Sequence, residues 1–125
     1  MTYYILDSDH NVVPVSDVVQ WAEFFRNGDR RVRRDELGGG EVVVSTVFLG
    51  LDHDFGVARP LIFETMIFGG PFSEHQWRYS TWAEAEARHA EILEQVRAVE
   101  ARPGRRLAVW LRRVLRFWLT KGQKS

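Results

Sequence analysis

The sequence predicts an α+β protein built on an antiparallel sheet, with two packed helices and a C-terminal basic amphipathic helix. Strand-like and helix-like runs follow one another in the order hairpin, helix, meander, helix, helix. The strand-like runs are joined by connections short enough for antiparallel pairing. The 125 residues are 45% hydrophobic and include five tryptophans and eight phenylalanines, which is enough for one packed core.

The N-terminal elements are predicted to be a β-hairpin followed by a helix. Two β-type runs, residues 3–6 and 12–15, flank a polar turn. Ser16 or Asp17 then caps a helix that runs to about Asn27. The apolar residues of this helix recur at helical spacing and are expected to form its buried face: Val18, Trp21, Phe24 and Phe25.

The middle of the chain predicts a β-meander. Residues 29–37 are rich in arginine, as is typical of an exposed edge strand. Residues 41–51 and 60–68 are dominated by β-branched and aromatic side chains, and residues 77–79 predict a further short strand. Because both central strands are apolar on both faces, we expect the second face of the sheet to be covered by the terminal helix or by a dimer partner.

A long helix is predicted from Thr81 to about Arg102. The spacing of Thr81 and Glu84 matches a capping box, and a Pro-Gly pair ends the helix. One side of the helix is apolar and the other is rich in glutamate. His89 lies on the apolar side, so we expect it to be a core or boundary histidine with satisfied hydrogen bonds rather than a ligand.

Charge divides the chain into an acidic α+β domain, residues 1–103, and a basic segment, residues 104–125. All seven basic residues of the segment lie in residues 105–125, which contain no acid, whereas the residues before them carry ten basic and 17 acidic side chains, a net charge of −7. A helix over residues 105–120 places most arginines on one side and the apolar residues on the other.

This basic helix has several predicted uses. It can pack on its own domain, lie on an anionic membrane surface, or bind a protein partner. Nucleic acid is disfavoured because the acidic body would repel phosphates. The residues expected to form the partner or membrane surface are Trp110, Arg112, Arg113, Arg116 and Trp118.

Composition excludes several kinds of chemistry. The chain has no cysteine, which removes disulfides, thiolate catalysis and Cys-based metal sites. Its first ten residues lack the basic and apolar regions of a secretory signal, and no run is long and apolar enough to span a bilayer. We therefore expect a cytoplasmic protein of the host cell, with peripheral membrane attachment as the alternative.

One group of residues suggests a catalytic or metal site. Asp52, His53 and Asp54 lie in a predicted loop, and Glu64 lies in the facing strand, so a suitable register would bring carboxylates and an imidazole together. Asp and His are also ordinary turn formers, and the body contains no lysine of the kind that metal-dependent nucleases use. We expect no catalytic residue, metal or cofactor here. We expect Glu64 to be partly buried and paired with one of four residues: Arg78, Thr46, His53 or His89.

Three segments carry a family resemblance: STVFLGLDHDFG at residues 45–56, LIFETMIFGG at residues 61–70 and RYSTWAEAEARH at residues 78–89. Together they resemble a family of small, uncharacterised proteins of tailed phages, prophages and many bacteria, over roughly residues 3–95. The resemblance implies a phage or mobile-element accessory setting and assigns no catalytic residue.

These observations lead to one main functional prediction and two alternatives. The main prediction is a non-enzymatic phage or prophage accessory protein that acts by binding a host protein, a phage protein or a second copy of itself; inhibition of a host system is one such role. The first alternative is a peripheral membrane protein anchored by the helix at residues 105–120. The second is a metal-dependent enzyme that uses Asp52, His53 and Glu64.

Overall fold

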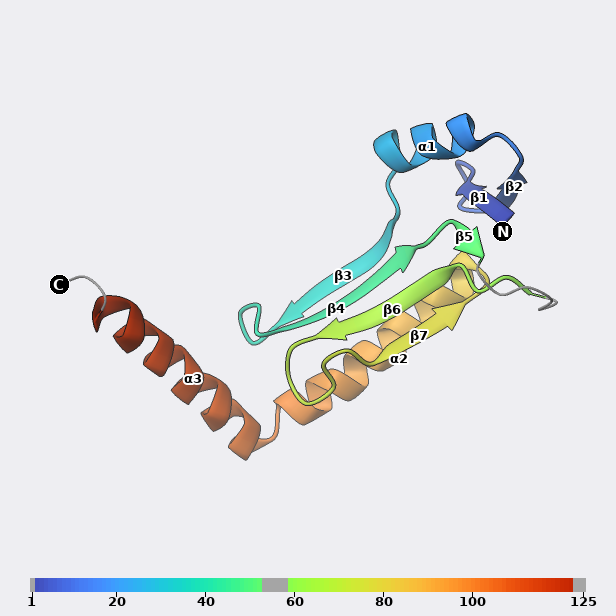
Figure 1. Cartoon of the computed structure of the whole chain (residues 1–125). Helices are drawn as coiled ribbons and strands as arrows, with labels where there is room; N and C mark the ends of the chain where they lie inside the picture. Colours follow the sequence, from blue (N-terminus) through green and yellow to red (C-terminus); the bar gives the residue numbers. More distant parts are fainter. Residues whose placement is uncertain (1, 53–58, 123–125) are drawn as a thin grey trace.

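The computed structural model describes residues 2–52 and 59–122; in the last helix, the side chains at 105, 106, 108, 109 and 117–122 lie outside the description. The described chain forms two antiparallel sheets and three helices (Figure 1). The predicted α+β class is therefore confirmed. The expectation of a single sheet is wrong, because the N-terminal hairpin belongs to a sheet of its own.

The N-terminal sheet contains β1 (Thr2–Leu6), β2 (Val12–Val15) and β5 (Leu51–Asp52), in the order β2-β1-β5. The Asp7 carboxylate stabilises the predicted hairpin turn by accepting hydrogen bonds from the backbone N–H groups of Asp9 and Asn11, at 2.9 and 2.8 Å. The chain reaches β5 through Gly50, whose φ of +72° favours glycine. The bend at Gly50 therefore sends the end of a predicted long strand into the other sheet.

Helix α1 (Val18–Asn27) begins after Asp17, whose side chain accepts a hydrogen bond from Val19 N at 2.9 Å. Trp21, Phe24 and Phe25 are partly buried, and both phenylalanines lie against Phe48 of the central sheet. Val18 is exposed, which shortens the predicted buried face of the helix by one residue.

The central sheet contains β3 (Arg31–Leu37), β4 (Val42–Phe48), β6 (Phe63–Phe68) and β7 (Gln76–Tyr79), in the order β3-β4-β6-β7. All neighbours are antiparallel, so the predicted meander is confirmed, and the arginine-rich strand lies at an edge as expected. Burial alternates along β4, where every second residue points into the core: Val42, Val44, Thr46 and Phe48.

Helix α2 (Trp82–Glu100) packs on one face of the central sheet (Figure 1). The Thr81 hydroxyl caps it by accepting a hydrogen bond from Glu84 N at 3.1 Å, as the capping-box spacing predicts. The residues that this helix buries come from the predicted apolar stripe: Ala85, His89, Ile92, Leu93 and Val96.

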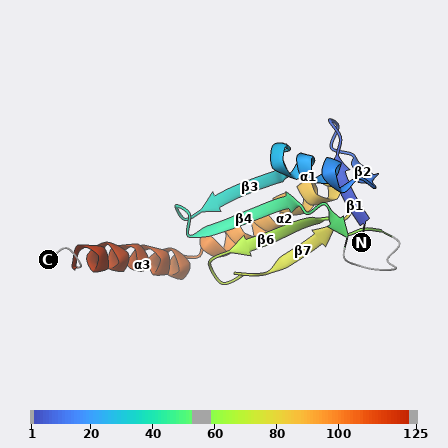
Figure 2. The same ribbon diagram turned by 45° about the horizontal axis from the view of Figure 1, so that its top comes forward.

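The opposite face of the central sheet is open. Val43, Val47 and Met66 on this face are partly buried, and Phe68 is 50% exposed. No described element of the chain covers them, so the predicted cover by the terminal helix is wrong. The reason is geometric: α3 (Pro103–Gly122) starts only two residues after α2, on the α2 side, and runs past the end of the sheet (Figures 1 and 2).

Helix α3 also begins slightly earlier than its sequence predicts. Pro103 and Gly104 were expected to separate two helices, yet the helix includes both. A proline in the first turn is compatible with helix geometry because its missing N–H would have no partner inside the helix. The break between α2 and α3 therefore consists of Ala101 and Arg102 alone.

Candidate functional site

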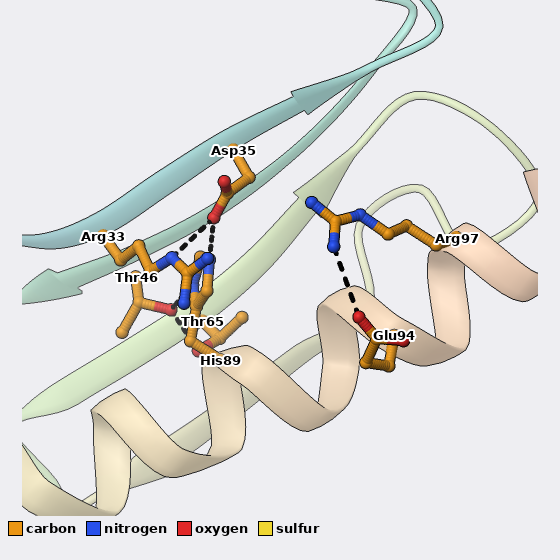
Figure 3. A network of polar contacts seen from close by, with 7 residues as sticks. All are labelled: Arg33, Asp35, Thr46, Thr65, His89, Glu94 and Arg97. Atoms are coloured by element: carbon orange, nitrogen blue, oxygen red, sulfur yellow. Dashed lines mark hydrogen bonds and ion pairs between the residues drawn. The ribbon is translucent and has the colours of Figure 1, made fainter.

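The largest buried polar arrangement in the described structure joins β3, β4, β6 and α2 (Figure 3). His89 contacts Thr46 Oγ1 through Nδ1 and Asp35 Oδ2 through Nε2, both at 2.7 Å. Thr46 contacts Thr65 Oγ1 at 2.5 Å, and Arg33 lies 2.9 Å from Asp35 Oδ2. These contacts confirm the prediction that His89 is a satisfied core residue.

The direction of these hydrogen bonds follows from the charge of Asp35. A carboxylate only accepts, so Nε2–H of His89 donates to Asp35, and Nδ1 of the neutral ring accepts from the Thr46 hydroxyl. Burial lowers the pKa of His89, which favours the neutral ring. Burial alone would raise the pKa of Asp35, but the hydrogen bond from His89 and the charge of Arg33 outweigh it and lower that pKa.

The carboxylate, imidazole and hydroxyl of this network lie in the order found in nucleophilic triads. In a working triad the hydroxyl must reach a substrate. Here Thr46 and His89 are both 0% exposed, so no substrate atom can approach either of them. The network is therefore a structural element that joins α2 to the sheet.

The metal hypothesis concerned Asp52, His53 and Glu64. Asp52 lies in β5 of the N-terminal sheet, whereas Glu64 lies in β6 of the central sheet. His53, like Asp54, lies outside the described residues. Across residues 2–52 and 59–122, no group of three or more His, Cys, Asp or Glu side chains is placed to hold a metal ion.

Glu64 has a structural partner. It lies directly opposite Arg78 in the register of β6 and β7, and Arg78 Nε is 3.0 Å from Glu64 Oε2. The Glu64 side chain is largely buried, so the guanidinium satisfies a carboxylate that would otherwise be costly. Arg78 was one of the four partners that the sequence suggested, and this pairing is confirmed.

The exposed surface with the strongest pattern is on α3. Leu107, Leu111 and Leu115 follow one another at one-turn spacing and are 56%, 46% and 60% exposed. We call these three residues the leucine row. Trp110 lies beside the row and is 58% exposed. Helix α3 thus does not bury this part of its apolar side on its own domain.

The other side of α3 faces the body. Arg113 donates a hydrogen bond to the carbonyl oxygen of Gly38 in the β3–β4 turn. Arg116 makes a two-point contact with Glu41, with Nη1–Oε1 and Nη2–Oε2 both at 3.2 Å. Because these contacts fix the arginine side against the body, the leucine row is presented away from it.

The remaining predicted surface residues divide in two groups. Arg112 and Arg113 are both exposed on α3, as Arg116 is. The side chain of Trp118 lies outside the description, although its backbone is helical.

Within the described part of the chain, no helix is both long enough and apolar enough to cross a bilayer.

No protein-family model, no curated protein and no solved structure matches the chain. The resemblance to phage and prophage proteins therefore stays a prediction.

Sequence reasoning predicted that His89 is satisfied but did not identify its hydrogen-bond partners. Asp35 is His89's acceptor, yet it lies in a strand that the sequence suggested only as a solvated, arginine-rich edge. The sequence places Asp35 among arginines that are expected to be exposed. An acid in such a strand can pair with its neighbouring arginines, so the sequence offered no reason to expect a contact between Asp35 and a helix residue.

Proposed function

We propose that this protein is a non-enzymatic binding protein that attaches to the surface of anionic membranes through α3. The observation that carries the proposal is the exposed leucine row on a helix whose described charges are all arginines. Amphipathic helices of this composition lie in the membrane interface with their apolar side in the acyl region.

The energies of such an attachment add from two sources. Transfer of three half-exposed leucines into the acyl boundary contributes about 1 kcal/mol each. Each arginine or lysine that reaches the anionic surface contributes about 1 kcal/mol more. Arg113 and Arg116 contribute in this way only if they leave their contacts with Gly38 and Glu41. The acidic body, with net charge −7, is repelled by the same surface and stays on the aqueous side.

A vesicle co-sedimentation experiment tests this function. The full chain is mixed with vesicles of equal parts phosphatidylglycerol and phosphatidylcholine, and with pure phosphatidylcholine vesicles, at low and high salt. Leu111→Asp places a charge in the leucine row. Val19→Asp is the control, because Val19 is an exposed apolar residue on another helix, α1, at 64% exposure against 46% for Leu111.

We expect salt-sensitive binding to the anionic vesicles, weakened at least about tenfold by Leu111→Asp and less than about twofold by Val19→Asp. Equal effects of the two substitutions, or no binding of the unaltered protein at low salt, would overturn the proposal.

A second candidate function is protein binding by the open face of the central sheet. The half-exposed Phe68 beside Val43 and Met66 favours it, because adjoining apolar side chains on an uncovered sheet face are typical of an interface. In this role the protein is a phage or prophage accessory factor whose partner is a host protein, a phage protein or a second copy. A partner from host lysate that is retained by Val18→Lys and lost by Phe68→Lys would support this candidate; equal capture by both variants would remove it.

A further inference from the structure

A hollow of about 450 Å³ lies where α3 leaves the body. Its walls come from the β3–β4 turn, the end of α2 and the first turns of α3, and include Leu37, Gly38, Arg97, Glu100, Trp110 and Arg113. Figure 1 shows this junction at the end of the central sheet. The hollow is open to solvent on one side and is large enough for a phosphate group.

The lining of the hollow carries one more positive than negative side chain. Arg97 and Arg113 line it from two different helices, against a single carboxylate, Glu100, which has an interaction of its own. Arg97 contacts Glu94 at 3.2 Å, but both side chains are at least half exposed, so solvent weakens this pair. The hollow is therefore suited to an anion.

Arg113 has only a neutral acceptor in its described contact, the carbonyl oxygen of Gly38. A phosphate oxygen is a stronger acceptor for a guanidinium than a neutral carbonyl oxygen, because its negative charge adds attraction to the hydrogen bond. The guanidinium also presents a fork of donors that matches phosphate geometry. A phosphate in the hollow would therefore draw Arg113 away from Gly38.

We propose that this hollow binds a phosphate group, and that the phosphate belongs to a lipid headgroup. The lipid source rests on the proposed function, since it assumes that α3 lies on a membrane. Trp110 lines the hollow and lies next to the leucine row. With the row in the acyl region, the indole lies at headgroup level and the hollow opens at the depth of the lipid phosphates.

Short-chain lipids test the site without a membrane. The full chain is titrated by calorimetry with dihexanoyl-phosphatidylglycerol below its micelle concentration, and separately with inorganic phosphate. Arg113→Gln removes one of the two arginines that line the hollow. Arg112→Gln is the matched control, since it removes the same charge from the same helix at a position that does not line the hollow.

We expect saturable binding of the short-chain lipid, weakened at least about fivefold by Arg113→Gln and less than about twofold by Arg112→Gln. Equal losses for the two variants, or no saturable binding by the unaltered protein, would overturn the site. Inorganic phosphate that binds as tightly as the lipid, with the same dependence on Arg113, would overturn the lipid source and assign the site to free phosphate.

The vesicle experiment separates this inference from the proposed function. Short-chain lipid binding without vesicle binding would overturn the membrane function and support the phosphate site. Vesicle binding that Arg112→Gln and Arg113→Gln weaken equally would overturn the site and support a membrane attachment by general charge.

Discussion

Helices α2 and α3 follow one another in the chain, and both are amphipathic, yet α2 buries its apolar side while α3 exposes the leucine row, among its described side chains. Helix α2 covers the sheet and pairs its exposed arginines with its own glutamates, as in Arg88–Glu91 and Arg97–Glu94. Helix α3 leaves the leucine row exposed, and its described charges are all arginines. An apolar stripe thus predicts that one side of a helix will be buried against something. The charges on the opposite side indicate whether that is the protein's own core or another surface.

The largest expected difference between the two helices is in the effect on stability of replacing one aliphatic residue in each by alanine. Ile92→Ala removes a side chain that is 1% exposed, and it should lower the free energy of unfolding by about 2–5 kcal/mol through loss of burial and the cavity left behind. Leu111→Ala should change it by less than about 0.5 kcal/mol because the residue is exposed. Urea unfolding followed by tryptophan fluorescence measures both. Equal losses would show that the leucine row packs on the body in solution.

A smaller effect is expected from the polar contact that α2 makes with β3. Asp35→Ala leaves the buried Nε2–H of His89 without an acceptor, which should cost about 1–3 kcal/mol of unfolding free energy. Glu36→Ala, on the neighbouring residue, removes only an exposed pair with Arg34 and should cost less than about 1 kcal/mol. Urea unfolding measures the loss of free energy in both variants. Similar losses for Asp35→Ala and Glu36→Ala would contradict a stabilising role of the network.

The same network predicts a pH dependence that belongs to α2 and not to α3. Burial lowers the pKa of His89 below its ordinary value of 6.5, so the unfolded chain binds the proton first as the pH falls. The contribution of neutral His89 to the unfolding free energy should therefore be complete above pH 6.5. It should decrease as the pH falls from 6.5 toward the folded-state pKa of His89. The lowered pKa of Asp35 adds a further loss below its ordinary 3.8.

Unfolding curves at a series of pH values check this dependence. His89→Gln should reduce the slope between neutral pH and pH 5, whereas Leu111→Ala should keep it. A slope that survives His89→Gln unchanged would assign the effect to other groups.

The smallest effect concerns the attachment of α3 to the body. Glu41→Gln removes the charge that Arg116 contacts. Because the Arg116 side chain is 69% exposed, solvent screens the pair, and stability should change by about 1 kcal/mol or less while the position of α3 loosens. The chain has no cysteine, so spin labels at Ala98→Cys and Leu115→Cys report the distance between α2 and α3 without background labelling.

We expect a broader distance distribution in the Glu41→Gln variant and no change in Glu91→Gln, which removes an exposed pair within α2. An unaltered distribution in Glu41→Gln would show that the Arg116 contact does not hold α3 in place.

Much of the fold is predictable from local sequence patterns. The elements, the capped start of α2, the edge position of β3 and the burial of His89 all follow from periodicity and capping chemistry. The division into two sheets does not, because it depends on how Gly50 bends the chain and which distant strand then pairs with residues 51–52. A run of β-branched residues looks the same whether it ends in one sheet or two.

The candidate site shows a similar limit. The sequence predicts that α3 is amphipathic, but packing on the body and exposure require the same pattern. The short connection after α2 decides between them, since it places α3 beyond the end of the sheet. The hollow at the junction depends on three separate segments meeting, which no local pattern encodes.

The pairing of β1 with β5 has a consequence for the order in which the chain assembles. Thr2 lies opposite Asp52, so the third strand of the N-terminal sheet is synthesised long after the first two. A two-stranded hairpin alone is marginally stable in water, and closing so long a loop costs entropy that only the finished sheet offsets. We therefore expect the β1–β2 hairpin to become stable only after residues 51–52 have been synthesised and have paired with β1.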